Sequence, residues 1–391
     1  MHIGMLLDHR FPGDMRVERE AAALLEAGHE VSILFFAGGA GSTPFGHDLS
    51  RMNLIQAPYP ESFLSRAWLK LFKTPGMMAA HGRRLGFEAV HVHDLPLAWT
   101  GLRAARRLGV PLVLDLHENY PGLVLSWGRF RRFKSRLWAA YEKWATSRAA
   151  RVITVIEENR DRLVGRGVRP EKLAVVPNSE DPAIFDQSET DPELLKKYEG
   201  RRVATYLGSF GPHRGLDTAV EATARLKERF PDLLLLIVGD RDPAEMAKLK
   251  ALVEKLDLKD HVELTGWQPF SKVPTYCRAS YLGLVPHRST PHTESTMPNK
   301  IHNFLFCHRP VIVSDIRPLK RLCEAHRFGL VFKAGDPVDL ADKMARLLDE
   351  PGLAEELART GEDWARNEGS WLQQKTALID LYRQLEQERP Q

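Results

Sequence analysis

The sequence has little of what marks a disulfide-bonded or membrane-spanning protein. Its only cysteines are Cys277, Cys307 and Cys323, an odd number without metal-site spacing, so we expect reduced thiols. The longest apolar runs, such as Leu233–Val238, are far shorter than the roughly 18 residues that a bilayer span needs. Met1 leads straight into an apolar segment, without a basic stretch or a cleavage site. These absences predict a cytoplasmic protein without a signal peptide or a transmembrane helix.

The chain also lacks a strong excess of one charge. Lysine and arginine number 55 and aspartate and glutamate 51, which leaves a formal net charge of only +4. This balance does not favour a nucleic-acid-binding protein. Hydrophobic residues make up 43% and charged residues 27%, which is typical of globular proteins and excludes a disordered chain. A length of 391 residues then predicts two domains.

What the sequence does contain is an alternation of strand-like and helix-like segments. The first unit of this pattern is a strand at 2–7, a helix at 15–27 and a strand at 30–36. Such alternation predicts a parallel sheet covered by helices on both faces. The pattern is interrupted by polar and proline-containing residues after position 177 and restarts with a strand at 203–207.

We therefore predict an α/β protein of two doubly wound, Rossmann-like domains that face a cleft. The N-terminal domain is expected at 1–180, a linker at 181–200 and the C-terminal domain at 201–365. A C-terminal helix at 366–391 is expected to pack back towards the N-terminal domain. Ligands of such sheets bind beyond the carboxyl ends of the strands, so the loops that follow the strands are where functional residues are expected.

A glycine-rich loop follows the strand at 203–207. Gly208, Ser209 and Gly215 allow a ligand to approach the backbone, and Arg214 adds a positive charge beside the start of a helix. This pattern favours phosphate binding, with an ordinary turn and a solvated arginine as the alternative. The loop does not match the GxGxxG fingerprint, so a nicotinamide cofactor is not indicated.

A second cation stands at the start of the helix predicted at 298–307. Pro298 suits the first helical position, and Lys300 then falls in the first turn, where the helix dipole disfavours a cation. An anionic ligand would remove this conflict, and a lysine that points into water is the alternative.

Polar residues also follow two strands of the N-terminal half. They are His91, His93, Asp94, Asp115, His117 and Glu118. A metal site of three histidines is conceivable, but a polar wall for a substrate is favoured, because buried strands usually satisfy their histidines by hydrogen bonds. In the loop after the first strand, Gly13 allows a tight backbone, and Arg16 either lines the cleft or pairs with Glu18.

The segment 126–144 mixes six basic residues with six aromatic ones. An amphipathic helix with its aromatic side chains in the core explains this composition. Contact with a membrane surface is the second interpretation, because aromatic rings and cations suit the headgroup region. Nucleic-acid binding is a third, weaker one, since no recognised module is present.

Taken together, the chain resembles the GT-B glycosyltransferases of family 4 from end to end. The matching segments are 11–20, 28–31, 115–118 with 120–121, 176–178, 208–215, 298–301 and 309–315. The resemblance implies a retaining transferase that binds a nucleotide sugar on its C-terminal domain and an acceptor on its N-terminal domain. It implies no metal and no further cofactor.

The resemblance also implies roles for individual residues. Arg214 and Lys300 would hold the diphosphate, and His117 would contact the donor sugar. The nucleotide would be bound by Gly208, Ser209, Gly215, Pro298, Asn299 and Asn303. The acceptor side would be lined by Gly13, Arg16, His93, Asp94 and Glu118.

One segment departs from the family pattern. The family usually carries a Glu-x7-Glu signature, and the matching positions here are Ser295 and Asn303, with Glu294 one residue out of register. Members with a Pro-x-Lys segment often lack the first glutamate, so only the second loss is unexpected. Asparagine accepts hydrogen bonds from ribose hydroxyls less strongly than a carboxylate does.

The expected function is sugar transfer to a glycan, lipid-linked or small-molecule acceptor in cell-envelope or polysaccharide biosynthesis. The enzyme is expected in the cytoplasm or at the inner face of the membrane. Two alternatives stay open at this point. One is a degenerate GT-B protein that binds a sugar or a partner without catalysis, and the other is a nucleotide-sugar epimerase on the same architecture.

Overall fold

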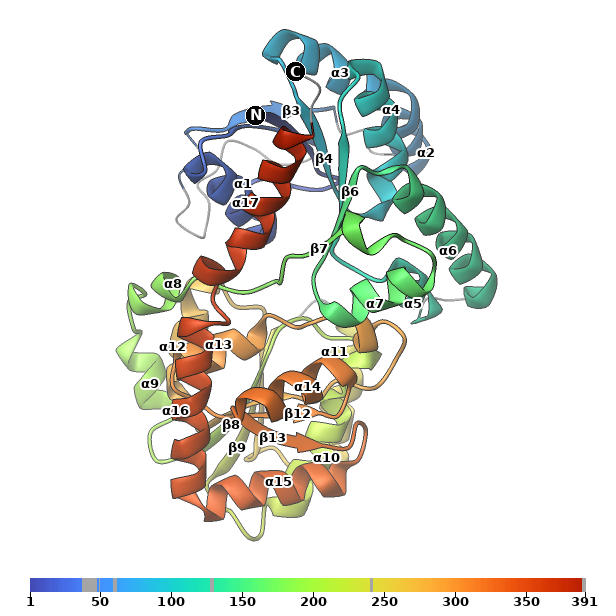
Figure 1. Cartoon of the computed structure of the whole chain (residues 1–391). Coiled ribbons are helices and arrows are strands. Elements are labelled where there is room, and N and C mark those ends of the chain that lie inside the picture. Colours follow the sequence, from blue (N-terminus) through green and yellow to red (C-terminus); the bar gives the residue numbers. More distant parts are fainter. Residues whose placement is uncertain (37–47, 49, 59–61, 127–129, 240–241, 389–391) are drawn as a thin grey trace. The chain divides into compact units, whose positions relative to one another are not determined.

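The computed structural model shown in Figure 1 describes residues 1–36, 48, 50–58, 62–126, 130–239 and 242–388. The chain forms two compact units. Unit 1 comprises Met1–Pro177 together with Gln374–Gln391, and unit 2 comprises Asn178–Gln373. Each unit is built on one parallel β-sheet.

The sheet of unit 1 has seven strands in the order β3-β2-β1-β4-β5-β6-β7. They are β1 (His2–Leu6), β2 (Glu30–Phe35), β3 (Asn53–Gln56), β4 (Ala89–His93), β5 (Leu112–Leu116), β6 (Arg151–Thr154) and β7 (Leu173–Val175). The chain runs outward from β1 to β3 and then returns to the other side of β1 with β4. The loops after β1 and β4 therefore diverge and leave a place for a ligand.

In the residues that the structure describes, eight α-helices flank this sheet. They are α1 (Met15–Glu26), α2 (Phe63–Trp68), α3 (Thr74–Leu85), α4 (Ala98–Leu108), α5 (Tyr120–Leu123), α6 (Arg131–Arg148), α7 (Glu157–Gly165) and α17 (Trp371–Gln387), which enters unit 1 at Gln374. Asp14 begins α1 by accepting a hydrogen bond from the Val17 N–H at 3.1 Å. Lys375 of α17 binds Glu26 of α1 at 2.5 Å, and Figure 1 shows the two helices side by side.

Unit 2 repeats the architecture with six strands in the order β10-β9-β8-β11-β12-β13. The strands are β8 (Arg202–Leu207), β9 (Leu233–Val238), β10 (Val262–Gly266), β11 (Leu282–Val285), β12 (Val311–Ser314) and β13 (Gly329–Phe332). The helices are α8 (Pro182–Asp186), α9 (Pro192–Lys197), α10 (Leu216–Leu226), α11 (Pro243–Lys255), α12 (Val273–Ala279), α13 (Lys300–Phe306), α14 (Arg317–His326), α15 (Pro337–Asp349) and α16 (Pro351–Asn367). Here the strand order reverses between β8 and β11.

The predicted fold class of two Rossmann-like domains is confirmed, and its details need three corrections. The segment 181–200 is no plain linker, because it folds into α8 and α9 and belongs to unit 2. The short strands β3 and β13 were not predicted. The helix expected from Pro298 begins at Lys300, which still places Lys300 in its first turn.

Two further observations concern the sequence's absences. All three cysteines are free thiols. Within the described ranges, none of the helices combines the length and the apolarity that crossing a membrane requires.

Candidate active site

Arg16 on α1 is the centre of a buried ion-pair network in unit 1. Its guanidinium donates to both carboxylate oxygens of Asp115 at 3.0 Å and to the Val176 carbonyl at 3.0 Å. It also lies 2.9 Å from Glu20, one turn along α1. Both carboxylate side chains are fully buried, and Arg16 is only 6% exposed. The expectation that Arg16 lines a cleft is therefore wrong, because its donors are used inside the unit.

His117 follows β5 and forms the outer edge of this network. Its Nε2 lies 2.8 Å from Asp115 Oδ2 and 3.3 Å from His93 Nδ1. Burial disfavours the charged ring, but Asp115 and Asp94 outweigh it and raise the pKa of His117 to about 10. The side chains of His117 and Asp94 are 15% and 21% exposed. At neutral pH the network thus offers an imidazolium at the edge that a ligand can reach.

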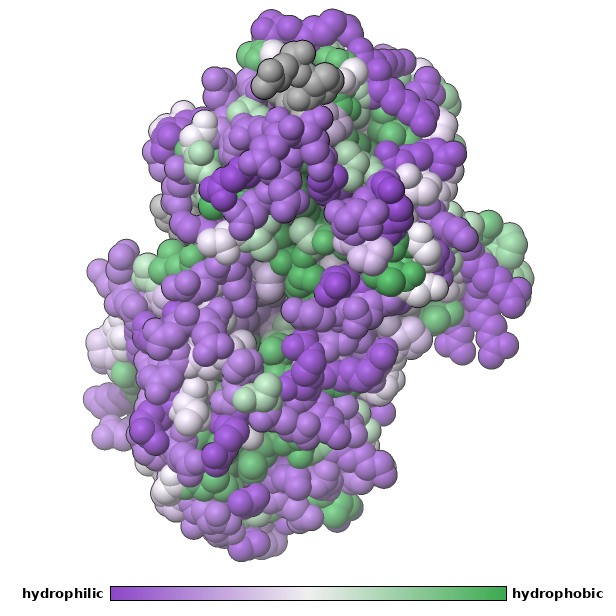
Figure 2. All heavy atoms as spheres, viewed as in Figure 1, coloured by the Kyte–Doolittle hydropathy of each residue, from purple (hydrophilic) through white to green (hydrophobic). Residues whose placement is uncertain are grey.

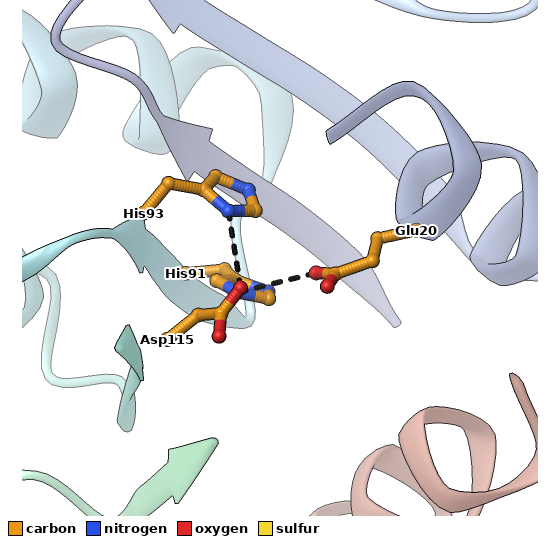
Figure 3. A group of neighbouring side chains, drawn as sticks. All are labelled: Glu20, His91, His93 and Asp115. Carbon is orange, nitrogen blue, oxygen red and sulfur yellow. Dashed lines mark ion pairs between the residues drawn. The ribbon is translucent and has the colours of Figure 1, made fainter. Parts of the chain in front are cut away.

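Four side chains of the network form a group that could hold a metal ion (Figure 3). One potential ligand atom from each of Glu20, His91, His93 and Asp115 lies within 4.8 Å of the others. Burial lowers the pKa of both histidines, so they are neutral. Arg16 already binds both carboxylates, and a metal ion would have to compete with it. The geometry therefore favours an ion-pair network, and it corrects the expectation that His93 lines a surface, since His93 is 1% exposed.

The C-terminal helix closes the network from another side. The Tyr382 hydroxyl on α17 lies 2.9 Å from His91 Nδ1. Tyr382 is fully buried, and burial raises its pKa well above the usual value. Sequence analysis missed this contact, because the two residues are 291 positions apart.

The loop after β1 contains a glycine, Gly13, whose backbone conformation is unusual. Gly13 is exposed and has φ +117°, a conformation that other residues rarely adopt. Its N–H donates to Glu18 Oε1 at 2.7 Å, so Glu18 binds this loop. A Cβ on Gly13 would meet no atom within 4 Å, which shows that the loop borders open space. Glu118 is half-buried just beyond His117.

The glycine-rich loop of unit 2 joins β8 to α10 and packs tightly against neighbouring loops. Gly215 has φ +66°, and a Cβ on it would lie 1.9 Å from the Pro286 carbonyl oxygen. A Cβ on Gly239 would lie 2.1 Å from the carbonyl oxygen of Gly208, which itself has φ +124°. Only glycine fits these positions, so the loops after β8, β9 and β11 meet closely at the switch point of the sheet.

Arg214 and Lys300 bring two cations to this place. Lys300 Nζ lies 3.7 Å from the centre of the Tyr206 ring, and Arg214 Nη1 lies 3.2 Å from His287 Nε2. Arg214 Nε is buried without a hydrogen-bond partner in the described part of the chain. Burial and the charge of Arg214 hold the pKa of Lys300 well below its usual value. These two side chains together could hold an anion.

Asn303 lies on the same helix as Lys300, α13. Asn303 is 7% exposed, and its Oδ1 has no hydrogen-bond partner among the residues described. Gly283 of β11 permits the close approach of α13, since a Cβ there would lie 2.3 Å from the Phe304 ring. Asn303 thus keeps an unused acceptor one turn after Lys300.

The other residues predicted to bind the nucleotide lie in the glycine-rich loop and directly before α13. The Ser209 carbonyl accepts a hydrogen bond from the Tyr206 hydroxyl at 2.8 Å, which fixes the glycine-rich loop to β8. Pro298 and Asn299 directly precede α13 and are half-buried. The structure brings the predicted residues of unit 2 to two adjoining loops.

Sequence analysis missed the histidines around Arg214. Burial and Arg214 lower the pKa of His213 to about 4, and burial with nearby His213 lowers that of His292 to about 3. His287 is also buried, and its pKa is well below its usual value for the same reason. These rings are neutral and leave the positive charge to Arg214 and Lys300. His287, two residues after β11, could have been found by inspecting that strand end.

Segment 126–144, which contains most of helix α6, has half-buried aromatic residues and also exposed apolar ones. Tyr141 and Trp144 are half-buried and stack at 5.5 Å. In contrast, Phe130, Phe133 and Leu137 are 74%, 62% and 54% exposed. Figure 2 shows hydrophobic and hydrophilic side chains side by side in this region. Residues 127–129 lie outside the described ranges, so the first part of the segment is not placed.

Comparisons with known proteins match both units. Residues 14–179 match the glycosyl transferase 4-like domain, and residues 187–364 match the glycosyl transferases group 1. The chain is 27% identical to 2-deoxystreptamine glucosyltransferase of Streptomyces kanamyceticus, over 78% of this chain and 79% of that protein. Sucrose-phosphate synthase from Thermosynechococcus elongatus is similar in structure, with a TM-score of 0.81, 19% identity and complete coverage of both chains. HepE of Anabaena, solved with UDP-glucose, has a TM-score of 0.76 at 18% identity over 98% of this chain and 100% of that one.

Proposed function

The chain belongs to the GT-B glycosyltransferases of the family 4 type, and from this premise we propose that it transfers a sugar from a nucleotide sugar to an acceptor with retention of the anomeric configuration and without a metal ion. In this reaction the bond between the anomeric carbon and the diphosphate oxygen breaks, and the diphosphate leaves with the electron pair. The acceptor oxygen bonds to the anomeric carbon and loses its proton. The UDP-glucose bound by HepE supports a nucleotide-sugar donor.

The observation that carries the proposal is the pair of cations in unit 2. Arg214 and Lys300 have no carboxylate within 4.0 Å among the described residues, and each charge disfavours the other. A leaving diphosphate supplies the missing negative charge, and it needs most stabilisation as the glycosidic bond breaks. Preorganised donors of this kind typically contribute about 3 kcal/mol each to lowering a barrier. Asn303 would receive the ribose with its unused acceptor.

His117 is proposed to bind a hydroxyl of the donor sugar. Its ring is an imidazolium at neutral pH and lies at the accessible edge of the network. A charged donor forms a stronger hydrogen bond to a hydroxyl than a neutral one does. Gly13, Asp94 and Glu118 would then line the acceptor side.

We propose that the reaction belongs to cell-envelope or polysaccharide biosynthesis and takes place in the cytoplasm or at the inner face of the membrane. The support is the exposed apolar stripe of α6 and the four cations beside it. Arg131, Arg132, Lys134 and Arg136 have no carboxylate within 4.0 Å in the described part of the chain. Anionic lipids would complement these charges while the aromatic rings enter the headgroup region.

The donor proposal is tested by thermal unfolding with UDP, GDP, ADP, CMP, dTDP and their common sugars, with and without magnesium. A nucleotide at 100 times its dissociation constant stabilises by about 2.7 kcal/mol. We expect one nucleotide to do so without magnesium, and we expect Arg214→Ala and Lys300→Ala to abolish the shift. Lys248→Ala, at an exposed lysine, is the control. An unchanged shift in both variants would reject the proposed site, and the anomeric configuration of the product, read by NMR, tests retention.

Membrane contact is tested by sedimentation with phosphatidylcholine vesicles, with and without phosphatidylglycerol. We expect binding only with the anionic lipid, and less of it for Phe133→Ser and Leu137→Ser. Leu372→Ser changes an equally exposed leucine on α17 and serves as the control. Equal binding of all variants would exclude α6 as the contact.

A further inference from the structure

Asp94, at the end of β4, has a backbone conformation that is almost reserved for glycine. Its dihedral angles are φ +73° and ψ +153°. Phe130 and Arg327 also have positive φ, but their ψ values of +25° and +46° place them in the left-handed helical region. The region that Asp94 occupies is strained for any residue with a Cβ, and such strain is retained where the side chain is needed.

An aspartate directly before a helical turn commonly caps that turn with its side chain, but Asp94 does not. A short helical turn, Leu95–Leu97, follows it, yet the carboxylate makes no capping hydrogen bond to that turn. Its Oδ1 instead accepts the backbone N–H of His117 at 3.2 Å, and burial together with the charge of Asp94 raises the pKa of the Tyr120 hydroxyl. The carboxylate therefore points away from its own helix and towards the loop after β5.

The Asp94 carboxylate also lies close to the His117 ring. Asp94 Oδ2 lies 3.7 Å from His117 Nδ1, while the other ring nitrogen is engaged by Asp115. That distance is too long for a direct hydrogen bond, so the Nδ1–H stays available to a ligand. The two side chains are also the exposed edge of an otherwise buried network.

Building on the proposed function, we propose that Asp94 is a positioning residue, whose strained backbone is maintained because its carboxylate orients His117 and keeps it charged for a sugar hydroxyl. The groups that face His117 come from three directions. They are Asp115 of β5, His93 and Asp94 of β4 and its loop, and Asp14, Arg16 and Glu20 of α1 and its cap. Asp115 and Asp94 favour the imidazolium, whereas burial and Arg16 oppose it.

The proposal predicts that stability and activity move in opposite directions. Asp94→Gly removes both the strain and the carboxylate, so we expect the melting temperature to rise by about 2–4 °C. The same variant should lower kcat/KM by roughly tenfold to a hundredfold, because His117 loses its orientation. An aspartate with a merely structural role would give the reverse stability change, so a lower melting temperature with unchanged kcat/KM would overturn the proposal.

Asp94→Asn separates charge from strain. It keeps a Cβ and a hydrogen-bond acceptor, so we expect the melting temperature at neutral pH to fall only by what the lost charge contributed to the imidazolium. Loss of the charge should move the titration of His117, followed by NMR of labelled histidine, to lower pH. The alkaline limb of the rate should move in the same direction. A His117 titration that is the same in Asp94→Asn and in the unmodified protein would overturn the proposal without any need for activity.

Two controls keep this outcome distinct from failure of the proposed function. Asp257→Gly relieves a positive φ of +53° at an exposed position of unit 2, and it should raise stability without altering the rate or the titration. Nucleotide binding should be unchanged in Asp94→Gly, because the nucleotide is assigned to unit 2. If no nucleotide binds to any variant, the proposed function fails, while the melting temperatures and the His117 titration still decide the role of Asp94.

Discussion

The two units present charged clusters at corresponding ends of their sheets, and these clusters differ in how their charges are balanced. In unit 1, Arg16 is enclosed by Asp115 and Glu20 and uses its donors within the protein. In unit 2, Arg214 and Lys300 are held beside each other with no carboxylate within 4.0 Å among the described residues. A balanced cluster stabilises the fold, whereas an unbalanced one costs stability until an anion binds. From this difference we assign a structural role to the cluster around Arg16 and an anion-binding role to the pair of Arg214 and Lys300.

The largest expected effect tests the balanced cluster. Arg16→Leu leaves Asp115 buried without its cation beside Glu20, whose pKa burial raises to about 8, so we expect the free energy of unfolding in urea to fall by about 3–5 kcal/mol. Arg16→Lys should recover part of the loss, because lysine cannot bind a carboxylate with two parallel hydrogen bonds. Arg10→Leu, at an exposed arginine, should stay within about 0.5 kcal/mol. Equal stability of Arg16→Leu and the unmodified protein would show that the cluster does not depend on this charge.

The second prediction concerns the unbalanced cluster. Lys300→Met should lower the transfer rate by about 10²–10³-fold, because the leaving diphosphate loses a cation. In the absence of ligand, its free energy of unfolding should be unchanged or higher, because burial and Arg214 both disfavour the charged lysine. Lys248→Met is the matched control. If ligand-free Lys300→Met lost as much free energy of unfolding as Arg16→Leu, the two clusters would not differ in their effect on stability.

The third prediction is a pH dependence in unit 1. The folded-state pKa of His117, about 10, exceeds the ordinary value of 6.5. Its contribution to stability is therefore complete below about pH 6.5 and is lost as the pH rises towards 10. The difference in free energy of unfolding between the unmodified protein and His117→Gln should shrink across this window by up to about 1.4 kcal/mol per pH unit. Asn367→Ala, which changes a non-titrating residue at an exposed position of α16, should show no such trend, and a flat difference for His117→Gln would contradict the charged network.

The smallest expected effect sharpens the assignment of the nucleotide. Asn303→Ala should weaken nucleotide binding about fivefold, since a neutral hydrogen bond contributes about 1 kcal/mol. Asn303→Glu should strengthen it by about tenfold, since a charged acceptor binds hydroxyls more tightly. Calorimetric titration measures both, with Asn367→Ala, at an exposed end of α16, as the control. If all three variants bind alike, the ribose contacts another residue.

Sequence reasoning succeeded where the signal is local. The strands predicted at 30–36 and 203–207 agree with β2 and β8 to within one residue at each end, because buried parallel strands are continuous apolar runs. Arg214 and Lys300 were found because each follows a strand or opens a helix. The short strands β3 and β13 escaped, since four residues carry too little periodicity to be distinguished from a loop.

Arg16 shows why local reasoning failed for the first cluster. From the sequence, Arg16 was expected either to line the cleft or to pair with Glu18, and its actual partner Asp115 lies 99 positions away. The strained conformation of Asp94 is equally invisible, because a glycine and not an aspartate would have been expected there. Both features arise from packing between elements that are distant in the chain.

The α/β class, the two sheets and the family could be predicted from the sequence, because hydrophobic periodicity and strand-end motifs lie within short segments. Which charges are neutralised could not, because it follows from tertiary contacts. The energy of a charge depends on its burial and on the distance to its partners, and both are set by contacts such as those of Arg16 with Asp115 and of His91 with Tyr382.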